Sequence, residues 1–192
     1  YQKKIIERGP NDFSWIGTIM GQPSSIVALV FKNDIVAGSI STESGDFFNI
    51  RPLGEGVHAV FELNSELLHN ANDFAFVDTE SLSKITDENV KSEGDTDSDG
   101  TFIDLLVGYT DGVAAASSDP AAIIQTHLDG TNQTLANSCV KFRYRLVRTE
   151  EITYNETGNI STDLDNLTDS GGDLSALHTS RDSFGADIVE PT

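Results

Sequence analysis

The four histidines of this chain are the side chains best suited to zinc chemistry, but their spacing forms no zinc motif. They are His58, His69, His127 and His178, and no His-Glu-x-x-His sequence occurs. That motif places two imidazoles on one face of a helix, with the glutamate as general base. His58 falls in a strand-like segment and His127 in a helix-like one, so structural roles are the better interpretation. The sequence therefore predicts no zinc site built by this chain alone.

Motifs for nucleophilic and phosphate chemistry are also missing from the sequence. No Gly-x-Ser-x-Gly elbow is present to raise a serine nucleophile, and no Gly-x-x-x-x-Gly-Lys loop is present to hold phosphate. Cys139, the one cysteine, follows a predicted helix end, and its neighbours Lys141 and Arg143 would favour the thiolate. We nevertheless interpret Cys139 as a buried, inert thiol. A single cysteine excludes any disulfide within the chain.

One acidic run has the beginning of a calcium loop. The sequence Asp95-Thr-Asp-Ser-Asp-Gly100 places carboxylates at loop positions 1, 3 and 5. Position 12, which needs a bidentate carboxylate, is Leu106, and no helix pattern precedes the run. A run of charge in a solvated segment explains these residues better.

The composition limits the classes of partner. The chain has 192 residues, of which 31 are acidic and 12 basic, so its formal charge is −19. Such a surface repels phosphate backbones and anionic lipids, so we expect neither nucleic acid nor a membrane as a partner. A hydrophobic content of 38% with ten phenylalanines is too high for a wholly disordered chain. The length suits one domain or two small ones.

The segment 13–63 is predicted to form a β-meander. Val57, Ala59, Phe61 and Leu63 alternate and share one face. Five strands of this kind can pair or close into a small all-β, barrel-like unit. Runs rich in Ile, Val and Phe, separated by turn residues, cover 13–20, 25–31, 35–41, 46–50 and 58–63.

The segment 79–100 is predicted to be an acidic linker. It carries seven Asp and Glu residues and few large apolar side chains. A segment with so little apolar area stays solvated. Linkers of this kind are also where proteases cut.

From residue 101 onward the pattern changes to α/β. Residues 102–109 are almost continuously apolar, as in a strand buried on both faces. Asp119-Pro120 predicts a helix start, with Asp119 as the N-cap and Pro120 at the first position, although Gly130 weakens the middle of this helix. Further elements are expected as strands at 142–147 and 186–189 and as short helices after 161–163 and around 174–181. We expect the sheet to be unfinished at Thr192.

A series of segments in this chain together resembles secreted bacterial reprolysin-like metalloendopeptidases, a family of metzincin metalloproteases. The first three are similar to the family's prodomain, and the others to the beginning of its catalytic domain. No one segment is specific, but their order extends over nearly the whole chain. The segments are Phe13-Ser-Trp-Ile-Gly17, the strand Ile35–Ile40, Phe48-Asn-Ile-Arg-Pro-Leu-Gly-Glu-Gly-Val-His-Ala59, Ile103-Asp-Leu-Leu-Val-Gly-Tyr-Thr110, Ala136-Asn-Ser138, Arg145-Leu-Val147, Tyr154-Asn-Glu156, and Arg181-Asp182 with Gly185-Ala-Asp-Ile-Val189.

The resemblance implies an α+β chain in three parts. Residues 1–78 would be a small all-β prodomain, 79–100 the activation linker, and 101–192 the N-terminal part of an incomplete α/β metzincin-type catalytic domain. The whole would be a secreted, extracellular bacterial zymogen of a zinc hydrolase. Its propeptide would assist folding and mask the cleft until the linker is cut.

The resemblance also implies cofactors and partners. The family's zinc motif, His-Glu-x-x-His-x-x-Gly-x-x-His, follows the strand similar to 186–189, so no catalytic residue can be assigned here. Zinc is expected for the complete enzyme and not for this chain alone. The implied partners are the C-terminal remainder of the catalytic domain, from the same precursor or a separate chain, and protein or peptide substrates. Asp104 and Asp182 match acids of a structural calcium site in adamalysin-type domains, with a surface or capping role as the competing interpretation.

Two alternatives remain open at the level of sequence. The chain could be a non-catalytic protein that keeps the protease scaffold and binds or inhibits a partner. It could also be a carbohydrate- or protein-binding β-module with an unrelated α/β part. The first alternative predicts a zinc-free, inactive protein, and the second predicts ligand binding by residues 1–78.

Overall fold

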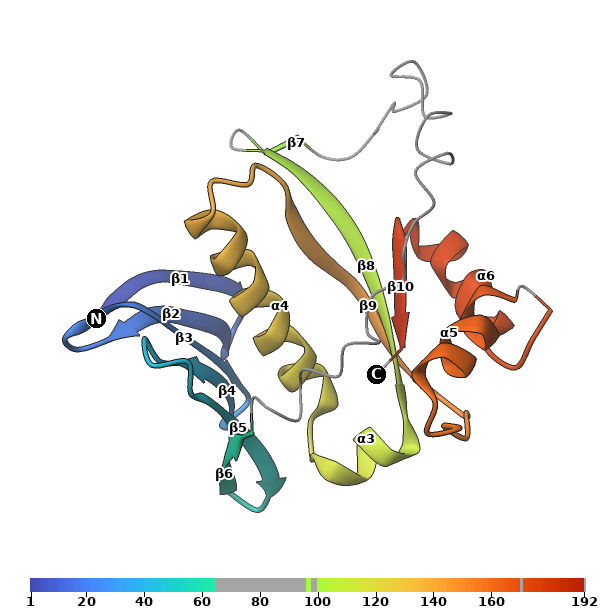
Figure 1. Ribbon diagram of the computed structural model, residues 1–192, viewed down its shortest axis with the longest axis horizontal. Helices are drawn as coiled ribbons and strands as arrows, with labels where there is room; N and C mark the ends of the chain where they lie inside the picture. Colours follow the sequence, from blue (N-terminus) through green and yellow to red (C-terminus); the bar gives the residue numbers. More distant parts are fainter. Residues whose placement is uncertain (65–95, 98–99, 170, 192) are drawn as a thin grey trace.

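The computed structural model describes residues 1–64, 96–97, 100–169 and 171–191 of the chain. They form two sheets with a long helix, α4, between them, and two further helices, α5 and α6, beyond the second sheet (Figure 1). Most of the predicted acidic linker falls in 65–95 and 98–99, outside the described residues. None of the described helices is long and apolar enough to cross a membrane.

The first sheet is an antiparallel meander of six strands in chain order. It confirms the five predicted strands and adds an unpredicted first one, whose alternation is hidden by charged residues. The strands are β1 (Gln2–Gly9), β2 (Asp12–Ile19), β3 (Gln22–Lys32), β4 (Ile35–Ser41), β5 (Phe47–Gly54) and β6 (Val57–Leu63). The turn between β3 and β4 has two residues, Asn33 and Asp34, with φ of 48° and 67°, and these residue types tolerate the left-handed region that such a hairpin requires.

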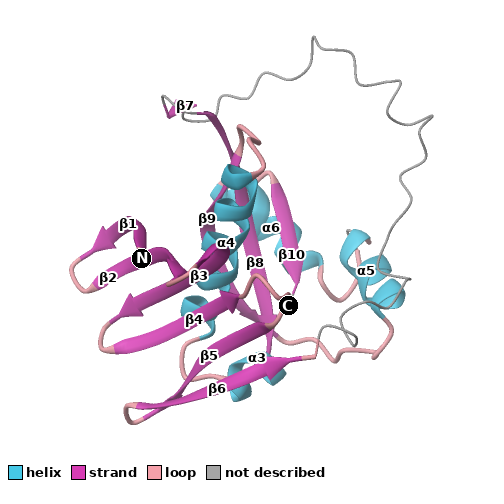
Figure 2. Cartoon of the chain, turned by 60° about the vertical axis from the view of Figure 1, so that its left-hand side comes forward, coloured by secondary structure: helices cyan, strands magenta, loops and turns pink. Residues whose placement is uncertain are grey.

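The prediction that the meander closes into a barrel-like unit is wrong. Within the described residues, β1 and β6 are the two edges of an open sheet and do not pair with each other (Figure 2). The physical reason lies in α4, which packs on β2, β3 and β4. Because a helix covers one face of the sheet, that face is buried without the sheet curling on itself.

The second sheet is built around the strand β8 (Gly100–Thr110). β9 (Arg143–Ile152) and β10 (Ile188–Pro191) pair in parallel with β8 on its two edges, and the short β7 (Thr96–Asp97) pairs antiparallel with its first residues. Leu105 and Val107 pack toward Ile124 of α4, whereas Leu106 packs toward Leu177 on the opposite face. The prediction of a strand buried on both faces is therefore confirmed, since successive side chains point to opposite faces.

The helices connect the parallel strands and cover both faces of this sheet. α4 (Pro120–Asn137) joins β8 to β9 on one face, while α5 (Ile160–Thr168) and α6 (Ser175–Phe184) lead from β9 to β10 on the other; α3 (Asp111–Ala116) is a short helix directly after β8. The predicted start of α4 is confirmed, because the Asp119 carboxylate accepts a hydrogen bond of 3.0 Å from the Ala122 amide. All the elements predicted after residue 101 are present.

Small side chains allow α4 to lie close to the first sheet. Ser14, Val30 and Ala37 pair across β2, β3 and β4 and form one row on the sheet. Each is at most 1% exposed, as is Ala122 of α4, which packs against Val30 and Ala37. The single helix α4 thus shares packing with both sheets, and its two sides belong to two different apolar clusters.

Candidate functional site

Two of the three described histidines contact the main chain. His58 accepts a hydrogen bond of 3.1 Å from the Val36 amide through Nε2, and His178 Nε2 lies 2.6 Å from the Leu167 carbonyl oxygen. His127 is on an exposed part of α4, and His69 lies outside the described residues. In the described ranges, no three His, Cys, Asp or Glu residues are grouped so that they could hold a metal ion.

The two calcium candidates lie in separate surroundings. Both carboxylate oxygens of Asp104 on β8 face Arg145, at 2.7 Å from Nε and 2.9 Å from Nη2. Asp182, on the exposed side of α6, pairs with its neighbour Arg181 at 2.7 Å. The acid beside Asp104 is instead Asp187, whose carboxylate accepts a hydrogen bond of 2.8 Å from the Asp104 amide. The calcium assignment of Asp104 and Asp182 stays a prediction.

Cys139 is exposed, so its expected burial is wrong. α4 ends at Asn137, and Cys139 follows in the left-handed region with φ of 59°. A residue in this position turns the chain out of the helix, which takes its side chain off the packed face of α4.

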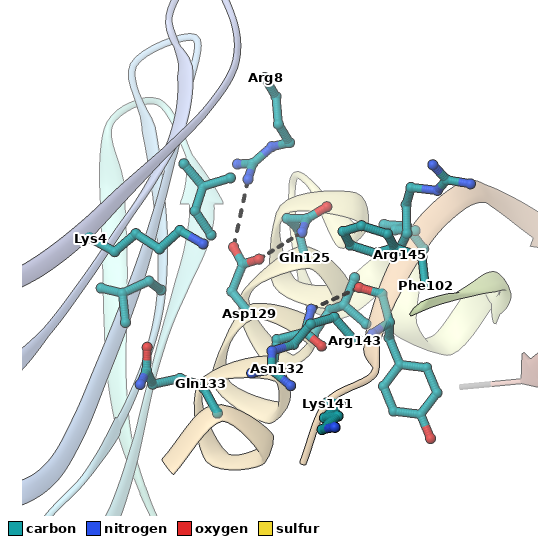
Figure 3. Close-up of a pocket in the computed structure, with 16 residues that line it drawn as sticks. Lys4, Arg8, Phe102, Gln125, Asp129, Asn132, Gln133, Lys141, Arg143 and Arg145 are labelled. Atoms are coloured by element: carbon teal, nitrogen blue, oxygen red, sulfur yellow. Dashed lines mark hydrogen bonds and ion pairs between the residues drawn. The ribbon is translucent and has the colours of Figure 1, made fainter. Parts of the chain in front are cut away.

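The structure reveals a buried carboxyl group where α4 meets the first sheet. Asp129 of α4 is only 5% exposed. It accepts hydrogen bonds from the hydroxyl of Ser14, which is fully buried, and from Gln125 Nε2 at 3.0 Å. Arg8 Nη1 of β1 lies 3.6 Å from its Oδ2 (Figure 3). Burial raises the pKa of Asp129, while its hydrogen bonds and the charges of Arg8 and Lys4 act in the opposite direction.

A cavity of about 610 Å³ opens beside Asp129, between β1, α4 and the start of β9 (Figure 3). Asp129 is the only carboxylate among the described residues that line it. Five of the chain's twelve basic residues line it as well: Lys4, Arg8, Lys141, Arg143 and Arg145. The apolar part of the wall includes Ile6, Ile16, Phe102, Leu128, Tyr144 and Leu146. The cavity is therefore strongly cationic in a chain of charge −19.

Two of these cations already have carboxylate partners, and three do not. Arg8 pairs with Asp12 at 2.8 Å, and Arg145 pairs with Asp104. Arg143 donates to the main-chain carbonyls of Phe142 and Val140, which carry no charge. Lys4 and Lys141 are exposed and form no ion pair with another described residue. Within the described residues, three positive charges at the cavity thus have no ion-pair partner, although the charge of Lys4 also acts on Asp129.

Sequence reasoning missed this site. The available signal was Asp129 itself, which stands seven residues after Ala122 and so falls on the same face of α4. Lys141 and Arg143 stood out only as neighbours of Cys139. Lys4 lies 137 residues before Lys141 in the chain, so their common cavity depends on the packing of β1 against the second half of the molecule.

The fold and this site define an α+β protein in which an antiparallel meander packs on the connecting helix of a parallel sheet. Along nearly its whole length the chain is similar to three bacterial proteins, each named peptidyl-Asp metalloendopeptidase. It is 27% identical over 183 residues to that of Xanthomonas campestris pv. campestris, and 30% over 191 and 26% over 185 residues to those of Stenotrophomonas maltophilia strains R551-3 and K279a. Each match covers 94% of this chain but only 44% of the relative, so the chain spans less than half the length of these curated relatives. No family model matches the chain.

Proposed function

We propose that this chain is the N-terminal portion of a secreted zinc metalloendopeptidase zymogen. The observation that carries the proposal is the similarity of 94% of the chain to 44% of the length of three peptidyl-Asp metalloendopeptidases. The parallel strands β8, β9 and β10, with helices on both faces, are consistent with the upper part of a reprolysin-like, metzincin-type catalytic domain. The particular substrates of the complete protein are part of the same proposal.

In this proposal residues 1–78 are a propeptide that assists the folding of the catalytic part and masks its cleft. The contact between the first sheet and α4 supports the folding role. Ala122 is 1% exposed beneath Val30 and Ala37, and Asp129 is held by Ser14. Without the sheet, this side of α4 would present apolar surface and a carboxyl group that has lost its main hydrogen-bond donor. The masking role rests on the family resemblance.

Zinc enters this proposal through the remainder of the protein. The described residues offer no group suited to the ion, so no step of peptide hydrolysis is assigned to them. When bound by the complete enzyme, zinc would activate a water molecule for attack on the peptide carbonyl. The partners proposed for this chain are accordingly the C-terminal remainder of the catalytic domain and peptide substrates.

The test is to produce the complete gene product that contains this sequence and to measure bound zinc and cleavage of aspartate-containing peptides. We expect about one zinc per molecule, activity that a chelator removes, and an increase in activity after proteolytic cutting within 79–100. A complete product that binds no zinc and cleaves no peptide before or after cutting would contradict the proposal.

A non-catalytic binding or inhibitor protein on the same scaffold is the second candidate. The cationic cavity beside Asp129 favours it, because three of its positive charges have no carboxylate partner among the described residues. This candidate predicts the zinc-free, inactive outcome of the same experiment together with a bound partner.

A further inference from the structure

The cavity beside Asp129 has the charge of a binding site for anions. Five of twelve basic side chains gather at one place, although the chain as a whole carries a charge of −19. In a protein so rich in carboxylates, basic side chains readily find acidic neighbours within the fold, as Arg8 and Arg145 do. Lys4 acts on Asp129 across the cavity without forming an ion pair with a described residue, and Lys141 and Arg143 have no carboxylate partner among the described residues. These charges raise the local attraction for an anion.

The three cations come from different parts of the chain and surround the cavity from different sides. Lys4 belongs to β1 in the first sheet, Lys141 lies between α4 and β9, and Arg143 is the first residue of β9 (Figure 3). A compact ion held at one of them would leave the others unpaired. Full pairing therefore requires a ligand with more than one negative charge, spaced along an extended body.

The rest of the wall favours a ligand with an apolar or peptide-like body. Ile6, Leu128, Phe102 and Tyr144 supply apolar and aromatic surface between the cations. Asn132 already binds the main chain of Tyr144 through both ends of its amide, at 2.8 Å each, and so holds this wall in place. The cavity volume of about 610 Å³ lies within the range of ordinary ligand sites.

We propose that this cavity binds an acidic peptide segment. Carboxylates of the peptide pair with Lys4 on one side and with Lys141 and Arg143 on the other, and its apolar side chains lie against Phe102 and Leu128. A peptide bound in this way bridges β1 and the start of β9. This goes beyond the proposed function, and its test requires no peptidase activity.

The experiment is a calorimetric titration of the full chain with two capped peptides, Ala-Asp-Leu-Glu-Ala and its uncharged counterpart Ala-Asn-Leu-Gln-Ala. We expect the acidic peptide to bind and the amide peptide to bind at least about tenfold more weakly, because only carboxylates pair with the free cations. Lys141→Gln should lower the affinity for the acidic peptide about threefold, as loss of one exposed charge pair does. The double variant Lys4→Gln, Lys141→Gln should lower this affinity about tenfold.

The control variant is Arg148→Gln, which removes the same charge from an exposed position of β9 outside the cavity. It should leave the affinity for the acidic peptide nearly unchanged. Lys4 and Lys141 are exposed, so their replacement should not impair folding, which circular dichroism checks. Equal binding of the two peptides, no binding of either, or an equal effect of Arg148→Gln and Lys141→Gln would each overturn the proposal.

Discussion

At the scale of the residue, a single carboxyl group, that of Asp129, links α4 to the first sheet. On folding, the Asp129 carboxyl group is buried at a site where Ser14 and Gln125 donate hydrogen bonds to it and Arg8 lies nearby. A buried carboxylate is tolerated only when hydrogen bonds and charges replace its hydration. Here they replace it in part, and burial still raises the pKa of Asp129.

The raised pKa predicts a pH dependence with a definite sign. Since the folded chain holds the Asp129 proton at pH values where the unfolded chain has released it, the stabilisation is fully present below the ordinary aspartate pKa of 3.8. It is lost as the pH rises through the higher folded value. We expect the free energy of unfolding of the native protein, relative to Asp129→Asn, to fall as the pH rises from about 4 toward neutrality.

Urea unfolding of both proteins across this pH range measures the difference. Because every other titrating group is common to the two proteins, their difference isolates Asp129. A difference that stays constant, or one that grows with pH, would show that Asp129 is not destabilised in its charged form.

At the scale of the element, the N-terminus of α4 depends on Asp119. Its carboxylate accepts from the Ala122 amide at 3.0 Å and lies 3.0 Å from Lys32 Nζ of β3. We expect Asp119→Ala to lower the free energy of unfolding by about 1–2 kcal/mol, because the cap is lost. Asp119→Asn keeps a capping oxygen and loses only a partly exposed ion pair, so it should cost about 0.5 kcal/mol or less. Equal losses in chemical unfolding of the two variants would argue against the cap.

The packing of α6 on the second sheet depends on the absence of a side chain at Gly108. A Cβ at this position of β8 would lie 2.9 Å and 3.1 Å from the two Cδ atoms of the buried Leu177. We expect Gly108→Ala to destabilise the protein by about 1–3 kcal/mol through overpacking. Gly112 of α3 is the matched control, because a Cβ there meets nothing closer than 3.6 Å. Gly112→Ala should be neutral or slightly stabilising in thermal unfolding, and an equal loss in both variants would contradict the explanation.

At the scale of the whole molecule, α4 couples the two sheets. Ile124 packs with Leu105 and Val107 of the second sheet, whereas its neighbour Ile123 packs with Val30 and Ala37 of the first. Because one helix supplies part of both clusters, loss of either sheet exposes apolar surface on α4. The described parts of the chain should therefore unfold together.

The single tryptophan provides the test of this coupling. Trp15 lies in the first sheet, so its fluorescence reports on that sheet, while far-ultraviolet circular dichroism follows the helices. We expect Ile124→Ala to cost about 2–5 kcal/mol and to shift the urea midpoints of both signals equally. Val60→Ala, at a side chain that is 66% exposed, should shift neither. A fluorescence midpoint that stays in place in Ile124→Ala would mean that the two sheets unfold independently.

The sequence by itself determined most of the elements of this protein, because local patterns encode them. The Asn33-Asp34 turn, the Asp119 cap and the apolar run of β8 each act over a few residues and were predictable. β1 was not, since its charged residues hide its alternation, and its pairing with β2 supplies the missing support. The resemblance to reprolysin-like metalloendopeptidases, carried by segments in a fixed order, also came from the sequence alone.

Only the tertiary structure decided how these elements meet. Whether the meander closes depends on α4 covering one of its faces, a contact between segments about 90 residues apart, such as Val30 and Ala122. Ser14 and Asp129 are separated by 115 residues, and the cations of the cavity lie on β1, just before β9 and at the start of β9. No local pattern records such distances, because burial and charge at these positions arise from packing between remote parts of the chain. The candidate site is therefore a product of the fold, although each of its residues is visible in the sequence.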